Sequence, residues 1–177
     1  MPQAEISYGH GLQRRKKMDA RAAIKLGIDM ADFVSLGYLQ DLSDAEFMLR
    51  AAPAINHINW QVGHLIASEH GMMTQIMPGS MPALPAGFAE KYTSETAKND
   101  DSAAFCKKDE LLRVQKEQRA GTLAALAKTT DEAFSNETGV HYAKTVADMF
   151  TLQGCHWLMH CGQWAVVRRQ TGRPPLF

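Results

Sequence analysis

Apolar residues recur at three- and four-residue steps along four long stretches of the chain, and polar residues fill the positions between them. This spacing is typical of amphipathic α-helices that turn one face toward a core. We find no alternation of apolar and polar residues long enough to predict a strand. The predicted long helices cover residues 18–40, from 54–56 to 76, 107–128 and 145–170.

Local signals mark the helix ends and the connections between them. Ser43 and Glu46 have the spacing of a capping box, which predicts a short helix that ends before Pro53. Gly172 and the two prolines that follow it predict the end of the last helix. Residues 77–105 are far too many for a helix hairpin loop, and they indicate a crossover connection.

These elements together predict an all-α protein. The fold we expect is a four-helix bundle with a long crossover connection between helices two and three. A chain of 177 residues suits one domain rather than two. We therefore assign residues 1–17 to an N-terminal extension and residues 18–174 to a single bundle domain.

Composition excludes several classes of protein. Hydrophobic residues make up 45% of the chain, which is enough for a packed core. The formal net charge is zero, whereas nucleic-acid-binding proteins usually carry a basic excess. The sequence has neither a long apolar run nor the apolar core of a secretory signal. With three cysteines in no recognisable disulfide or metal pattern, we expect a cytoplasmic protein that binds neither nucleic acid nor membrane.

Two histidines carry the clearest chemical signal in the sequence. His156 and His160 are four residues apart in a predicted helix, so their side chains lie about 40° apart on one face. Both imidazoles then point the same way, as the ligands of one metal ion must. Met149 and Val167 share this face, so we predict that it is buried or lines a cleft. The alternative is a pair of core histidines that neighbouring helices satisfy by hydrogen bonds without a metal.

A third histidine favours the metal interpretation. His64 lies in the second predicted long helix, and the small residues Ser68 and Gly71 on its face leave space beside the ring. Helical bundles build metal sites from ligands on facing helices. We therefore predict a divalent metal site formed by His64, His156 and His160. Three protein ligands leave a fourth position open for water or substrate.

Three further residues are candidates for the surroundings of this site. His57 could be a fourth ligand, a proton relay or a hydrogen-bonding residue at the start of its helix. We favour the last role, because two helical turns separate it from His64 by about 10 Å. We expect Trp60 to pack beside the site. Gln163 either hydrogen-bonds a metal ligand or a bound water, or is an amide at the edge of the core.

Other residues receive simpler interpretations. Cys155 fits a small core residue, and Glu69 an ordinary charge on the helix surface. Arg168 is interpreted in the same way as Glu69, although it could form an ion pair across the bundle. Phe88 and Tyr92 in the crossover could contact a substrate, but they could equally pack the loop.

Two runs of sequence resemble the DinB/YfiT-like superfamily of metal-dependent enzymes. The first is residues 56–65, Asn-His-Ile-Asn-Trp-Gln-Val-Gly-His-Leu. The second is residues 156–163, His-Trp-Leu-Met-His-Cys-Gly-Gln, which is similar to the HxxxHxGQ signature of that family. The resemblance extends over residues 18–174.

This resemblance implies a DinB-like four-helix bundle that binds its metal through His64, His156 and His160, and it implies a homodimer. Zn or Ni is the metal we favour, with Fe as an alternative, because imidazole nitrogen suits all three. Relatives include transferases and isomerases that use a low-molecular-weight thiol, together with many members of no known activity.

The function that we favour is a metal-dependent transferase that uses a low-molecular-weight thiol and acts on a small-molecule substrate. Two alternatives stay open at this stage. One is a metal-dependent hydrolase, for which the sequence offers no obvious inward carboxylate beside the histidines. The other is a non-enzymatic metal-binding or stress-related protein, which would hold its metal with the fourth position closed.

Overall fold

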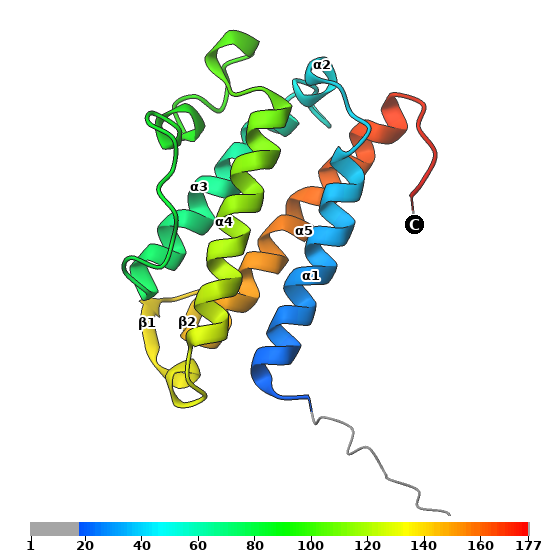
Figure 1. Cartoon of the computed structure of the whole chain (residues 1–177). Helices are drawn as coiled ribbons and strands as arrows, with labels where there is room; N and C mark the ends of the chain where they lie inside the picture. Colours follow the sequence, from blue (N-terminus) through cyan, green and yellow to red (C-terminus); the bar gives the residue numbers. More distant parts are fainter. Residues whose placement is uncertain (1–17, 177) are drawn as a thin grey trace, which may run out of the picture.

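The computed structural model describes residues 18–176, so the predicted N-terminal extension lies outside the described part of the chain. Helices dominate these residues, as the sequence predicts (Figure 1). The helices are α1 (Ala20–Leu39), α2 (Asp44–Phe47), α3 (Ile58–Ile76), α4 (Lys108–Lys128) and α5 (Val146–Gln170), with short 3₁₀ turns at Ala89–Tyr92, Ser102–Ala104 and Glu132–Ser135. None of the described helices is long and apolar enough to cross a lipid bilayer.

The four long helices lie side by side, and their contacts define an order. α1 packs along α5, α5 packs against α3, α3 packs against α4, and α4 meets α1 (Figure 1). The α3–α5 side is therefore opposite the α1–α4 side. Residues 77–107 connect α3 to α4 and run along the outside of α3, where the turn Ala89–Tyr92 packs.

A two-stranded antiparallel sheet departs from the sequence prediction, which contained no strand. Strands β1 (Glu137–Val140) and β2 (Ala143–Thr145) pair at the end of the molecule where α5 begins (Figure 1). The strands have four and three residues, too few for an alternating pattern to stand out in the sequence. Thr145 ends β2 and also caps α5, since its side chain accepts a hydrogen bond from the Asp148 backbone N–H.

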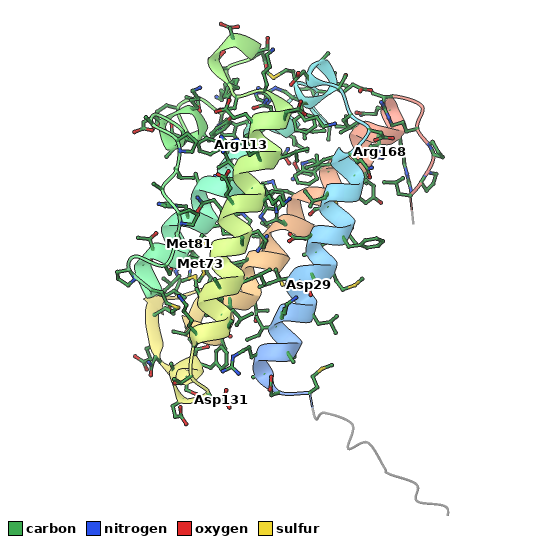
Figure 2. The ribbon with its side chains drawn as sticks, viewed as in Figure 1. Asp29, Met73, Met81, Arg113, Asp131 and Arg168 are labelled. Carbon is green, nitrogen blue, oxygen red and sulfur yellow. The ribbon has the colours of Figure 1, made fainter. Side chains whose placement is uncertain are left out.

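The buried side chains form two clusters along the length of the helices. One lies at the hairpin end and includes Ile28, Met73, Leu126 and Phe150 (Figure 2 labels Met73). The other joins α3 and α5 to the connection formed by residues 77–107, whose Phe88, Tyr92 and Phe105 are buried against them. Phe88 and Tyr92 are thus loop-packing residues, which is one of the two roles predicted for them.

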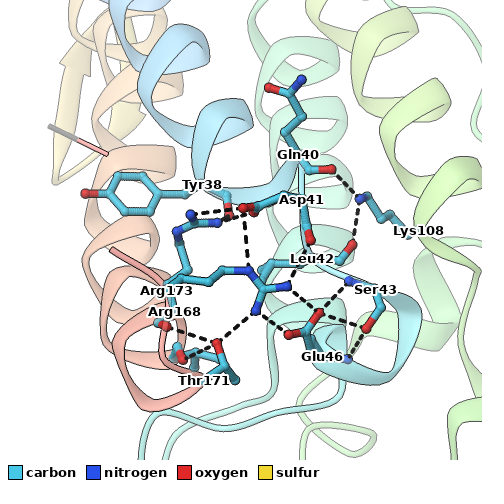
Figure 3. Close-up of polar contacts among 11 residues, drawn as sticks. Tyr38, Gln40, Asp41, Leu42, Ser43, Glu46, Lys108, Arg168, Thr171 and Arg173 are labelled. Carbon is cyan, nitrogen blue, oxygen red and sulfur yellow. Dashed lines mark hydrogen bonds and ion pairs between the residues drawn. The ribbon is translucent and has the colours of Figure 1, made fainter. Parts of the chain in front are cut away.

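A clamp of charged side chains holds the end of α5 to the turn between α1 and α2 (Figure 3). The Arg168 guanidinium is buried and pairs with the Asp41 carboxylate. Arg173 pairs with Glu46, which also completes the predicted capping box by accepting from the Ser43 backbone N–H at 2.8 Å. Arg168 therefore forms the ion pair that was considered possible from the sequence. The surface position assigned to it is wrong, because the residue is buried.

Candidate metal centre

Three histidine side chains meet between α3 and α5. His64 comes from α3, and His156 and His160 come from successive turns of α5. One ring nitrogen from each lies within 4.8 Å of the other two. The ring centroids are 5.4 Å apart for His64 and His156, 5.9 Å for His64 and His160, and 5.2 Å for His156 and His160. All three rings are partly exposed, so the group lies in the wall of the molecule rather than deep in its core.

The connection between α3 and α4 positions His64 through an aromatic stack. The Trp60 ring lies parallel to the His64 ring at a centroid distance of 4.9 Å and an angle of 6°. Trp60 is itself fixed, because its indole N–H donates to the Thr93 carbonyl and the Thr96 hydroxyl, both at 3.1 Å. Trp60 therefore packs beside the group, as predicted, and links one imidazole to the loop that follows α3.

The side-chain amide of Gln61 on α3 fixes which ring nitrogen of His160 carries the proton. The Trp164 indole N–H can only donate, and it lies 2.9 Å from Gln61 Oε1. The Asn56 carbonyl can only accept, and it faces Gln61 Nε2. These partners orient the amide, so the atom 3.1 Å from His160 Nδ1 is an acceptor. Nδ1 of His160 therefore carries the proton, and its Nε2 keeps the lone pair that a metal ion needs.

Gln163 acts one step further from the histidines. Its Oε1 accepts a hydrogen bond of 2.9 Å from Gln61 Nε2. Gln163 thus stabilises the amide that holds His160 rather than reaching an imidazole itself. Such supporting hydrogen bonds set the orientation and the basicity of metal-binding histidines in many proteins.

The three imidazoles are neutral at ordinary pH. Burial lowers the pKa of His64. Burial and the neighbouring imidazoles lower the pKa of His156 and of His160 to about 4, from the ordinary 6.5. Each ring can therefore offer a lone pair without first losing a proton, which is the state that binds metal. The donor set of three close imidazole nitrogens therefore fits a divalent metal ion.

His57 lies apart from this group, at the start of α3. Its Nδ1 accepts from the Trp60 backbone N–H at 3.0 Å, so it caps the helix. Its Nε2 must then carry the proton, which it donates to the Asn99 carbonyl at 3.1 Å. Both ring nitrogens are occupied, which leaves His57 the helix-start role favoured from the sequence.

Two further simple interpretations from the sequence are wrong, besides the surface position assigned to Arg168. Glu69 is only 2% exposed and does not lie on the helix surface. Its carboxylate accepts from the Thr122 hydroxyl at 2.6 Å and pairs with Arg119 at 3.1 Å. Cys155 is exposed, not a core residue. The single apolar stripe assumed for each helix failed in both cases, because α3 contacts α4 as well as α5 and because one side of α5 faces solvent.

Sequence reasoning also missed Gln61, although it lies inside the run that carries the resemblance. The available signal was its position three residues before His64, which places the two side chains about 60° apart on α3. A glutamine that is 2% exposed on such a face must find partners for both ends of its amide. One of those partners is a metal-site histidine.

The fold and the three-histidine group define a mostly helical protein with a site that could hold a divalent metal ion. The family model described as the DinB superfamily matches residues 33–164, a range that contains all three histidines. The chain belongs to this family. A search of curated proteins found no match.

Proposed function

We propose that this DinB-superfamily protein is a metal-dependent transferase that uses a low-molecular-weight thiol. His64, His156 and His160 would bind Zn or Ni, on the four-helix bundle with a crossover that the sequence predicts. The observation that carries the proposal is the composition of the group. Three neutral imidazoles converge within 4.8 Å, and no Cys, Asp or Glu of residues 18–176 joins them there.

The charge of such a site supports a thiolate as the reacting partner. Three neutral ligands leave the full charge of a divalent ion uncompensated, because no carboxylate belongs to the group. An anion is the ligand that best balances this charge. A divalent ion held by these three histidines would supply Lewis acidity, which would lower the pKa of a small thiol so that it reacts as thiolate at neutral pH. A thiolate is itself the nucleophile, so the reaction needs no carboxylate base from the protein.

The residues of this chain would hold and orient the reacting groups. Gln61 keeps the proton of His160 on Nδ1, and Trp60 keeps the plane of the His64 ring fixed. With a haloaromatic substrate, the thiolate sulfur bonds to the carbon that bears the halogen, and the halide leaves with the electron pair of the broken bond. We expect a small electrophile as substrate, a homodimer as the assembly and the cytoplasm as the place of action.

Metal content tests the first half of the proposal. Elemental mass spectrometry of purified untagged protein should find about one divalent ion per chain. The His156→Ala/His160→Ala variant should hold almost none. His70→Ala is the matched control, because His70 lies on α3 but outside the group and contacts Gln118. An empty parent that takes up neither Zn nor Ni on titration would contradict the proposal.

Turnover tests the second half. The metal-loaded parent should conjugate 1-chloro-2,4-dinitrobenzene with a small thiol such as cysteine or glutathione, and chelation should abolish the rate. Hydrolysis of an ester such as p-nitrophenyl acetate without thiol would identify a hydrolase instead. Tight metal binding with neither activity would identify a metal-binding protein without catalysis, which is the other alternative left open by the sequence.

A further inference from the structure

A groove between α1 and α4 lies on the opposite side of the molecule from the histidine group. It has a volume of about 950 Å³, which is the size of a small-molecule site. Asp29 of α1 and Arg113 of α4, both labelled in Figure 2, lie on the two helices that border it. Its apolar walls come from both helices: Phe33, Leu36, Leu112 and Leu123.

The floor of the groove is charged and buried. Arg119 lies there with its side chain only 4% exposed. Its Nε is 3.1 Å from Asp32 Oδ1, and its Nη1 is 3.1 Å from Glu69 Oε1. Two carboxylates thus share one guanidinium, and the cluster carries a formal charge of −1. One additional positive charge would therefore bring the formal charge of the cluster to zero.

Some polar atoms at the floor of the groove also lack an aligned hydrogen-bond partner. Asp32 Oδ1 and Arg119 Nε and Nη1 are buried from solvent, yet their ion pairs are not aligned as hydrogen bonds. Of the two carboxylates, Asp32 is the accessible one, with a side chain 20% exposed against 2% for Glu69. Because part of the Asp32 side chain is exposed in the groove, its carboxylate can accept an N–H from a ligand there.

The rim does not supply the missing cation. Lys108 Nζ donates to the Gln40 and Leu42 carbonyls, at 2.7 and 2.6 Å. Asp109 and Lys116, which also line the groove, offset one another in charge. An added anion would have to compete with two carboxylates for Arg119, whereas an added cation brings the floor to neutrality.

We propose that this groove is a second ligand site, which binds a small organic cation with N–H donors and an apolar body. The cationic head lies against Asp32, and the body lies between the leucine side chains of α1 and α4. An amidinium or guanidinium head suits the site best, because its planar pair of N–H groups matches a carboxylate. This inference does not rest on the proposed metal chemistry.

Three probes of nearly the same shape test the charge preference. Benzamidine is a cation at neutral pH with no free lone pair for a metal, benzamide is neutral, and benzoate is an anion. Isothermal titration calorimetry on the full chain should find saturable binding of benzamidine, with benzamide and benzoate at least tenfold weaker. Equal affinity for benzamide, a preference for benzoate, or no saturable benzamidine binding at millimolar concentration would overturn the proposal.

Variants test the location. Asp32→Asn should weaken benzamidine binding at least tenfold, whereas Glu117→Gln on α4, which pairs with Arg113 and does not line the groove, should change it less than twofold. Ala120→Trp fills the groove from α4 and should abolish binding, while Ala127→Trp on the same helix, which does not line the groove, should not. Circular dichroism checks the fold of each variant, so the Trp pair decides the matter if Asp32→Asn unfolds. Benzamidine binding that survives both Asp32→Asn and Ala120→Trp would place it elsewhere and overturn the proposal.

Discussion

Between α3 and α5 the polar groups are neutral rings and amides, whereas between α1 and α4 they are two carboxylates and a guanidinium. On the first side each orientation follows from hydrogen bonds, as in the chain from Trp164 through Gln61 to His160. On the second side attraction between charges holds the groups, and some of their hydrogen-bonding capacity is unused. Both sides use α5, since Arg119 also donates to the Gln153 carbonyl and lies over the Trp157 ring.

The difference shows two ways to keep polar groups inside a small helical protein. Burying a neutral imidazole costs little free energy. A hydrogen-bond network that fixes the protons of the imidazoles leaves their lone pairs directed at a ligand. Burying a charged group costs much more free energy, so such a group must be paired with an opposite charge. Burial raises the pKa of Glu69 and of Asp32, and Arg119 opposes that shift for both. We therefore expect the charged side to dominate stability and the neutral side to dominate metal affinity.

The largest expected effect breaks the charged side. Arg119→Met keeps most of the buried volume but leaves two carboxylates without their cation. Removing one partner of a buried ion pair typically destabilises a protein by about 3–5 kcal/mol. Urea denaturation followed by circular dichroism should show a loss of this size in the free energy of unfolding.

Arg113→Met is the matched control, because Arg113 forms an exposed pair with Glu117 on the same helix. Exposed pairs contribute about 0–1 kcal/mol, so this variant should unfold close to the parent. If Arg119→Met unfolded at the same urea concentration as Arg113→Met, the buried cluster would not be the structural element described above.

The next largest effect concerns the neutral side. Gln61→Leu removes the acceptor that keeps the His160 proton on Nδ1. Loss of such a supporting partner typically weakens metal binding by about 10- to 100-fold. Competition of the protein with a zinc chelator measures this change in affinity directly.

Gln61→Glu distinguishes positioning from general damage. A glutamate keeps an acceptor for His160 and Trp164 but loses the donors to Asn56 and Gln163. Its zinc affinity should stay within a few-fold of the parent. Gln118→Leu, which loses an amide beside His70 instead, should bind zinc like the parent. Equal weakening by both Gln61 variants would show that the tautomer of His160 is not what the amide controls.

The sequence predicted the neutral side far better than the charged side, for a physical reason. His156 and His160 share a helix, so their spacing alone predicts their convergence. The capping box at Ser43 and the end of the last helix at Gly172 are local in the same way, and both are confirmed. The start of α3 was placed two to four residues too early, because the helix begins after the His57 cap rather than at residues 54–56.

The cluster of Asp32, Glu69 and Arg119 could not be predicted from spacing, because its members come from three different helices. A lone charge in an amphipathic helix normally faces water, so Glu69 was assigned to the surface. Only the three-dimensional packing of α3 against α4 shows that the charge has a buried partner. The β1–β2 hairpin escaped prediction because its strands are too short to show a period.

A smaller effect tests how the connection between α3 and α4 supports the neutral side. A Cβ on Gly63, the residue before His64, would lie 2.2 Å from the Tyr92 ring. Gly63→Ala should therefore displace the connection around Tyr92 and destabilise the protein by about 1 kcal/mol, as the clash outweighs the gain in helix propensity. Thermal denaturation measures this change. Gly71→Ala on the same helix meets nothing within 4 Å and should stabilise slightly. Two variants of equal stability would mean that Tyr92 moves aside freely.

The smallest effect contrasts the buried cluster with a partly exposed charge pair, at the clamp between α5 and the α1–α2 turn (Figure 3). The Arg173 guanidinium and the Ser43 backbone N–H lower the pKa of Glu46 from 4.5 to about 2. Because the unfolded chain binds the proton more readily, this carboxylate stabilises the fold above pH 4.5, and its contribution disappears as the pH falls toward 2. The pair is partly exposed, so we expect it to contribute less than about 1 kcal/mol to the free energy of unfolding.

Glu46→Gln should match the parent in stability near pH 2 and fall below it at pH 6, as urea denaturation at both values would show. A constant difference at both pH values would mean that the charge of Glu46 does not stabilise the clamp.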